Sequence, residues 1–100
     1  MRVTGFVWDK GNQTKCEKHG VTREEIEALF QRPVWVAPDV KHSSTEERFL
    51  AVGRGANRRP MFVVFTLRQE GEELLLRPIS ARYMHEKEVK RYAEAFTEDE

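Results

Sequence analysis

The sequence predicts an α+β domain in which helices flank an antiparallel β-sheet. Two short helical segments lie within residues 12–30, three strand segments follow one another between residues 48 and 81, and an amphipathic segment follows them. Strands that are joined by short turns usually pair in sequence order, which gives an antiparallel meander. The helices before and after this meander then flank the sheet.

The first expected elements are a strand and a short helix. A strand is predicted over residues 3–8, where valine, phenylalanine and tryptophan precede the turn-prone residues 9–12. A helix from about residue 12 to residue 18 follows, and Gly20 is expected to close it in a left-handed conformation.

The second helix has clearer boundary signals. Thr22 and Glu25 have the spacing of a capping box, and Val21 is placed to pack against Ile26 as a hydrophobic staple. Pro33 ends the helical pattern. The expected buried stripe of this helix consists of Ile26, Leu29 and Phe30.

The remaining elements are four strands and a last helix. The predicted strands cover residues 34–37, 48–54, 61–67 and 74–81, with a polar loop at 40–45. The last helix is predicted over residues 86–96, and the tail after it, about 97–100, is expected to fray. Its apolar face consists of Val89, Tyr92, Ala93 and Phe96.

Composition limits the possible classes of protein. A chain of 100 residues with 39% hydrophobic content indicates one small domain, residues 1–100. No apolar run approaches the roughly 20 residues of a spanning helix, and the first residues lack the apolar segment of a signal peptide, so a soluble, cytoplasmic protein is expected. A single cysteine cannot form a disulfide within the chain, and it does not combine with the three scattered histidines into the spacing of a zinc site. No metal or cofactor is therefore expected.

The zero net charge conceals a basic central region. Seven arginines and three acidic residues lie between residues 48 and 82, which gives a local charge of +4. Acidic residues concentrate in the second helix and at the C-terminus instead. Arginine is suited to forked contacts with phosphate or carboxylate, so this region is the candidate surface for a polyanion.

Strand periodicity places several of these arginines. Arg48 and Arg54 fall on one face of their strand, with Leu50 and Val52 between them. On the last strand, Ser80 and Arg82 likewise share a face.

Arg77 falls on the other face of the last strand unless Pro78 introduces a bulge. Arg82 is therefore the stronger site candidate of the two.

Acid–base candidates are few. Lys18 and His19 end the short helix, where the helix dipole favours a protonated imidazole. His19 is either a general acid or base, or a cap for the last carbonyl groups. Glu47 either accepts a proton from a nucleophile or pairs with an arginine.

Other distinctive side chains have structural interpretations. Cys16 is expected to be a packing residue rather than a nucleophile, because no third group orients it with His19. Trp8 and Trp35 are assigned to the core in preference to base stacking. His42 is expected in a solvated loop, and His85 begins and caps the last helix.

An ordered set of short motifs resembles the BrnT family of bacterial toxins over about residues 5–93. The motifs are Phe6-Val7-Trp8-Asp9, Lys18-His19-Gly20-Val21, Phe30 with Pro33, His42-Ser43, Glu47-Arg48-Phe49, Val52-Gly53-Arg54, Phe65-Thr66, Ile79-Ser80-Ala81-Arg82 and Arg91-Tyr92. No single motif is specific, but their order is.

The resemblance implies a RelE-like fold and a ribonuclease toxin of a type II toxin-antitoxin system that cleaves RNA and inhibits translation. It also implies a BrnA-like antitoxin with a ribbon-helix-helix DNA-binding part, so that DNA is bound only through this partner. No membrane partner is implied.

Metal-independent RNA cleavage needs a base for the 2′-hydroxyl, an acid for the leaving oxygen and cations for the phosphorane. Arg48, Arg54 and Arg82 are the expected phosphate ligands, and Ser80 shares the face of Arg82. His19 or Glu47 is the candidate base, and Lys18 or His85 the candidate acid.

Two other classes compete with a ribonuclease. A RelE-like domain without cleavage activity would act as a corepressor or protein-binding module, and intact RNA after induction would identify it. An independent DNA-binding domain is disfavoured, because no predicted helix carries the basic run needed for groove docking.

Overall fold

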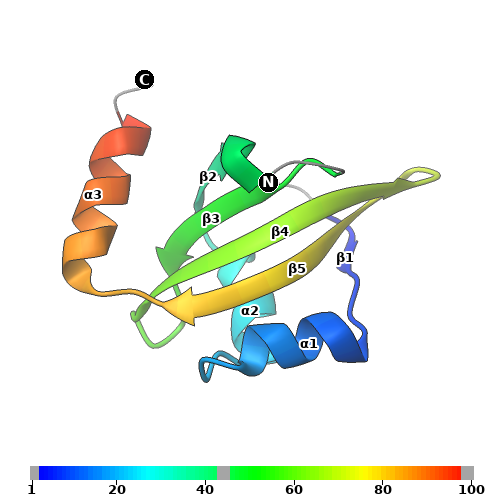
Figure 1. Cartoon of the computed structure of the whole chain (residues 1–100), viewed down its shortest axis with the longest axis horizontal. Helices are drawn as coiled ribbons and strands as arrows, with labels where there is room; N and C mark the ends of the chain where they lie inside the picture. The colour runs from blue at the N-terminus through cyan, green and yellow to red at the C-terminus, as the bar shows by residue number, and fades with distance from the viewer. Residues whose placement is uncertain (1–2, 43–45, 98–100) are drawn as a thin grey trace.

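The computed structural model describes residues 3–42 and 46–97, which form one five-stranded sheet and three α-helices (Figure 1). The strands are β1 (Gly5–Phe6), β2 (Trp35–Pro38), β3 (Phe49–Arg54), β4 (Pro60–Glu70) and β5 (Glu73–Tyr83). The helices are α1 (Lys10–Glu17), α2 (Arg23–Leu29) and α3 (Glu86–Thr97), and a 3-10 turn, η1, covers Val40–His42. The predicted α+β class is confirmed.

The sheet is open and has the strand order β1-β5-β4-β3-β2. Strands β2 to β5 pair antiparallel in sequence order, so the predicted meander is confirmed. β1 joins β5 in parallel, which makes the sheet mixed rather than purely antiparallel. The strand predicted over residues 3–8 is only two residues long, because the chain leaves the edge of β5 to begin α1.

Helix α1 is fixed to the edge of β5 by a buried amide. Asp9 caps the helix, and Asp9 and Asn12 form a capping box, so α1 begins before the predicted residue 12. The Asn12 side-chain amide donates to the carbonyl oxygens of Val7 and Pro78, both at 2.9 Å. At the other end, Gly20 has φ +86°, the left-handed conformation expected of it.

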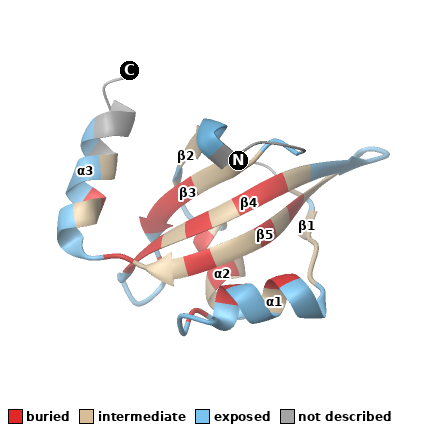
Figure 2. Ribbon diagram, in the orientation of Figure 1, coloured by how far each residue is buried: buried red, intermediate tan, exposed pale blue. Residues whose placement is uncertain are grey.

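Helices α1 and α2 cover one face of the sheet and build the main core (Figure 2). The capping box of Thr22 and Glu25 is present as predicted, and Ile26 and Leu29 are fully buried. Burial of these side chains against the sheet is the main source of stability for a domain of this size. The buried core residues are Cys16, Val21, Ile26, Leu29, Ala51, Met61, Val63, Phe65, Leu76 and Ala81.

Helix α3 packs on the other side of the sheet, at one end of it (Figure 1). A small second hydrophobic cluster lies between α3 and the sheet. Val52, Met84 and Val89 are buried in it, and Phe62 and Tyr92 are partly buried against it. The predicted packing of α3 through Val89 and Tyr92 is therefore confirmed. The predicted contributions of Ala93 and Phe96, the loop residues 43–45, the side chain of His42 and the end of the tail at 98–100 lie outside the described part of the chain.

The two tryptophans differ from each other. Trp8 is half-buried, and its indole Nε1 donates to Glu27 Oε2 at 2.8 Å. Trp35 lies on the edge strand β2 and is 37% exposed, so its assignment to the core is wrong. Among the described strands, β2 is at the end of the strand order and pairs with β3, so Trp35 is not enclosed by strands on both sides. Helix α3, which does not belong to the main core, contacts β2.

Candidate functional site

The sheet face opposite α1 and α2, which we call the open face, bears five of the seven central arginines. Strand register places alternate residues of β3, β4 and β5 on this face, and α3 packs on it at Val52 and Phe62 and also contacts β2. The arginines of the open face are Arg48, Arg54, Arg68, Arg77 and Arg82. Arg59 is different, since its guanidinium stacks 3.5 Å from the ring of Tyr83.

A β-bulge in β5 brings Arg77 to the open face. Val64 pairs with Ser80 but Phe65 pairs with Pro78, so Ile79 is an extra residue in β5. Without the bulge, the side chains of Ser80 and Arg77 would lie on opposite faces of the sheet, and the extra residue places them on the same face. Arg77 therefore shares a face with Ser80 and Arg82. The sequence predicts this arrangement only if Pro78 introduces a bulge, and the bulge is present.

One group of candidate residues gathers where α3 begins, and we call Arg54, Arg82, His85, Glu86 and Glu88 the α3 cluster. Arg54 forms a two-pronged ion pair with Glu86, at 2.7 and 3.0 Å. Arg82 pairs with Glu88 in the same way, at 3.0 and 3.2 Å. The backbone N–H of His85 donates to Glu88 Oε1 at 3.2 Å.

These ion pairs fix the charge state of the α3 cluster. The hydrogen bond from Arg82, helped by the His85 N–H, lowers the pKa of Glu88 to about 2. The hydrogen bond from Arg54 lowers the pKa of Glu86, and both arginines have raised pKa values because of their glutamate partners. All four groups stay charged near neutral pH.

The guanidinium of Arg82 is held in place on two sides. It lies 4.9 Å from the centre of the Phe62 ring, and it donates three hydrogen bonds, two to Glu88 and one to the carbonyl oxygen of Tyr83. A guanidinium has five N–H donors. Arg82 can therefore still donate to a phosphate oxygen while Glu88 holds it.

A second group surrounds a surface pocket of about 400 Å³ beside α1, which we call the α1 pocket. Three cationic side chains line it: Lys15 from α1, Arg48 directly before β3 and Arg77 from β5. Its remaining lining residues are Gly11, Asn12 and Ile79. Three positive charges around one hollow favour an anion.

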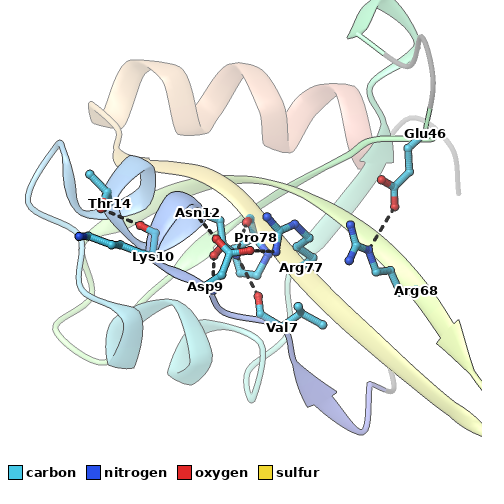
Figure 3. Close-up of polar contacts among 9 residues, drawn as sticks. All are labelled: Val7, Asp9, Lys10, Asn12, Thr14, Glu46, Arg68, Arg77 and Pro78. Atoms are coloured by element: carbon cyan, nitrogen blue, oxygen red, sulfur yellow. Dashed lines mark hydrogen bonds and ion pairs between the residues drawn. The ribbon is translucent and has the colours of Figure 1, made fainter.

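Arg77 is oriented in this pocket by Asp9 (Figure 3). An Nη1 donor of Arg77 lies 2.6 Å from Asp9 Oδ2, while Asp9 Oδ1 accepts the backbone N–H of Asn12. The bond from Arg77 is the main reason that the pKa of Asp9 is lowered. On the same face, Arg68 pairs with Glu46 at 3.7 Å.

Thr66 lies between Arg48 and Arg77 in the sheet. It pairs with Arg77 in the register and is 1% exposed. Among the described residues, its hydroxyl oxygen is a buried side-chain polar atom without a hydrogen-bond partner. Such a group carries a desolvation cost.

The predicted phosphate ligands Arg48, Arg54 and Arg82 do not converge on one point. Arg48, directly before β3, and Arg54, at its end, are six positions apart, a separation of about 20 Å in extended chain. Arg54 and Arg82 belong to the α3 cluster, whereas Arg48 lines the α1 pocket. The open face therefore carries two separate groups of cationic side chains rather than one.

The other predicted site residues lie at different distances from these groups. Ser80 is on the open face between Arg77 and Arg82, and Glu47 is exposed directly before Arg48. Lys18 and His19 are exposed in the turn between α1 and α2. They belong neither to the lining of the α1 pocket nor to the ion pairs of the α3 cluster.

Sequence reasoning missed Lys15, Glu86 and Glu88. The two glutamates could have been predicted from the sequence. They lie in the first turn of the last helix, which begins a few residues after Arg82, so they are placed to pair with a nearby arginine. Lys15 gave no comparable signal, since its contribution depends on α1 lying beside β5.

Cys16 lies in the core, and burial raises the pKa of its thiol to about 11. A thiol in this state is a poor nucleophile. Within residues 3–42 and 46–97, no group of three or more His, Cys, Asp or Glu side chains is arranged to hold a metal ion. None of the described helices is both long and apolar enough to span a bilayer.

The fold and the open face define a small α+β domain with an arginine surface directed at anions. A family model described as "Ribonuclease toxin, BrnT, of type II toxin-antitoxin system" matches residues 8–88, and the chain belongs to this family. The family implies an RNA target and an antitoxin partner. A search of curated proteins gives no match to the chain.

Proposed function

We propose that this protein is a cytoplasmic, metal-independent endoribonuclease that cleaves RNA, inhibits translation and is neutralised by a BrnA-like ribbon-helix-helix antitoxin. Membership of a ribonuclease toxin family supports RNA as the substrate. The observation that carries the proposal for the site is the α3 cluster, where an exposed histidine follows closely on an arginine that is held by an ion pair.

Within the α3 cluster, Arg82 and Arg54 would stabilise the negative charge that gathers on the phosphorane. Their pKa values are raised, so they remain cationic throughout the reaction. His85 would act as general acid or base, since its exposed imidazole can accept and donate a proton. The Ser80 hydroxyl, on the same face as Arg82, would donate to a phosphate oxygen.

The α1 pocket would hold a neighbouring phosphate of the same RNA strand. Lys15, Arg48 and Arg77 supply its positive charge, and Glu47, next to Arg48, is the alternative base. Lys18 and His19 remain candidates from the sequence alone.

Expression of Arg82→Ala, Arg82→Lys and His85→Gln beside wild type tests the catalytic assignment. Loss of a transition-state cation costs about 10²- to 10³-fold in rate, so Arg82→Ala should permit growth and leave RNA largely intact. Arg23→Gln, on α2 at the other side of the sheet, is the matched control for loss of one arginine. Equal RNA degradation by Arg82→Ala and wild type would overturn the assignment.

Two further measurements test the remaining parts of the proposal. Cleavage by purified protein should persist in excess chelator, and loss of cleavage there would contradict metal independence. Coexpression with a ribbon-helix-helix protein encoded beside this gene should restore growth, and only the complex should shift promoter DNA. RNA that stays intact with the wild-type protein would instead identify a non-catalytic module.

A further inference from the structure

The exposed indole of Trp35 lies next to the α3 cluster. Trp35 pairs with Val52 in the register of β2 and β3, so the two side chains lie on the same face of the sheet. Arg54 is two residues beyond Val52 and shares that face, which makes it a diagonal neighbour of Trp35. Diagonal neighbours in a sheet lie about 7–8 Å apart, within reach of long side chains.

A surface pocket of about 350 Å³ forms at this place, and we call it the Trp35 pocket. Trp35, Arg54 and Arg32, which follows the end of α2, supply its aromatic and cationic groups. Pro33, Val34 and Gly53 complete the lining. A pocket of this volume is large enough for a small planar ligand.

The chemistry of this lining favours a single-stranded nucleic acid. A flat aromatic surface stacks on an unpaired base, and neighbouring arginines bind the phosphates on either side of it. A protein segment added to the free edge of β2 would also bury Trp35, but the two arginines at the pocket favour an anionic ligand.

We propose that the Trp35 pocket stacks one unpaired base of the RNA that lies on the open face. This inference rests on the proposed function and adds a subsite to it. Arg54 belongs to both the α3 cluster and the Trp35 pocket, so the stacked base is that of a nucleotide close to the phosphate that is cleaved. The pocket would therefore contribute to the affinity for unpaired RNA, since an aromatic surface can stack on any base.

Binding of a non-cleavable 2′-O-methyl oligoribonucleotide tests the inference, with inorganic polyphosphate as a probe that has charge but no bases. Stacking of one base is worth about 1–3 kcal/mol, so Trp35→Ala should weaken oligonucleotide binding by roughly 5- to 150-fold. Polyphosphate binding should not change, and Trp35→Phe should retain part of the affinity. Val40→Ala, at another exposed hydrophobic side chain of the described residues, is the matched control and should bind as wild type does.

Tryptophan fluorescence gives an independent readout. The oligonucleotide should quench the emission of wild type, and the quenching should be lost in Trp35→Phe, where only Trp8 remains. If wild type binds the oligonucleotide tightly and Trp35→Ala binds it equally well, the base-stacking role of Trp35 is overturned while the proposed function stands. If Trp35→Ala loses antitoxin binding but still binds RNA as wild type does, the base-stacking role is overturned and Trp35 belongs to a protein interface. If the wild-type protein does not bind RNA, the proposed function is overturned as well.

Discussion

Asp9 accepts a 2.6 Å hydrogen bond from Arg77, a residue 68 positions away in the chain, and also caps helix α1. One carboxylate thus connects the start of the first helix to an arginine of the last strand. Because Arg77 lines the α1 pocket, Asp9 sets both the position of the guanidinium and part of the charge that an incoming anion meets.

Replacement of Asp9 separates its role as the cap of α1 from its effect on the charge of the α1 pocket. Asn is as good an N-cap as Asp, so Asp9→Asn should keep α1 and leave the melting temperature nearly unchanged. The charge that neutralises Arg77 is then gone, so binding of RNA or polyphosphate should become tighter. Asp9→Ala also loses the cap, and its melting temperature should fall by roughly 4–8 °C, measured by circular dichroism. Weaker polyanion binding by a folded Asp9→Asn protein would contradict this role.

The Glu88 carboxylate should make stability depend on acidic pH. Its pKa is about 2 in the folded protein and 4.5 without the fold, so the ion pair with Arg82 stabilises the fold fully above pH 4.5. This contribution is lost as the pH falls from 4.5 towards 2. Melting temperatures across that range should fall less steeply for Glu88→Gln than for wild type. Asp9 and Glu86, whose pKa values are also lowered, keep some acid sensitivity in the variant. Parallel curves for the two proteins would show that the Glu88 ion pair is not maintained in solution.

Salt dependence should reveal which arginines bind phosphate. Each phosphate contact with single-stranded nucleic acid contributes about 0.7 to the slope of log affinity against log salt. Arg77→Gln and Lys15→Gln should each reduce the slope by about this amount and weaken RNA binding at low salt. Arg23→Gln removes the same charge from the other side of the sheet, where Arg23 pairs with Glu27, and should leave the slope unchanged. Equal effects of Arg77→Gln and Arg23→Gln would indicate only a general charge effect.

The local elements of this fold were predictable because their signals lie within a few residues of one another. The capping box of Thr22 and Glu25, the left-handed Gly20 and the meander from β3 to β5 all occur as expected. Pairings between distant segments were not predictable in this way. The parallel contact of β1 with β5 and the position of α1 beside Pro78 depend on the assembled sheet.

The candidate site was likewise predictable within single strands but not between distant segments. Strand periodicity placed Arg48 with Arg54 on one face of their strand, and Ser80 with Arg82 on one face of theirs. It could not show that the two strands turn these residues to the same side of the sheet, or that Arg48 is far from Arg54 and Arg82. The bulge at Ile79 shifts the alternation by one residue, and a proline signals such a shift only as a possibility. Trp35 was assigned to the core because an apolar side chain in a strand usually faces it, and the position of β2 at the sheet edge overrides that tendency.

Thr66 provides a test of stability on the open face. Its buried hydroxyl is unpartnered among the described residues, so Thr66→Val removes a desolvation cost and keeps the shape of the side chain. The free energy of unfolding should rise by roughly 1 kcal/mol, measured by urea denaturation. Val64, the neighbouring residue on the same face, gives a control in Val64→Thr, which should be destabilising. A lower stability of Thr66→Val would show that the hydroxyl has a partner in solution.

The strand order also has a consequence for synthesis of the protein. In the described sheet β1 pairs with β5, and β5 lies between β1 and β4, so β1 has no strand to pair with until residues 73–83 have left the ribosome. Arg77, Arg82 and helix α3 are made with or after that strand. A nascent chain can therefore assemble neither the α1 pocket nor the α3 cluster before β5 emerges, so the toxin stays incomplete on the ribosome while all of its earlier strands are being made.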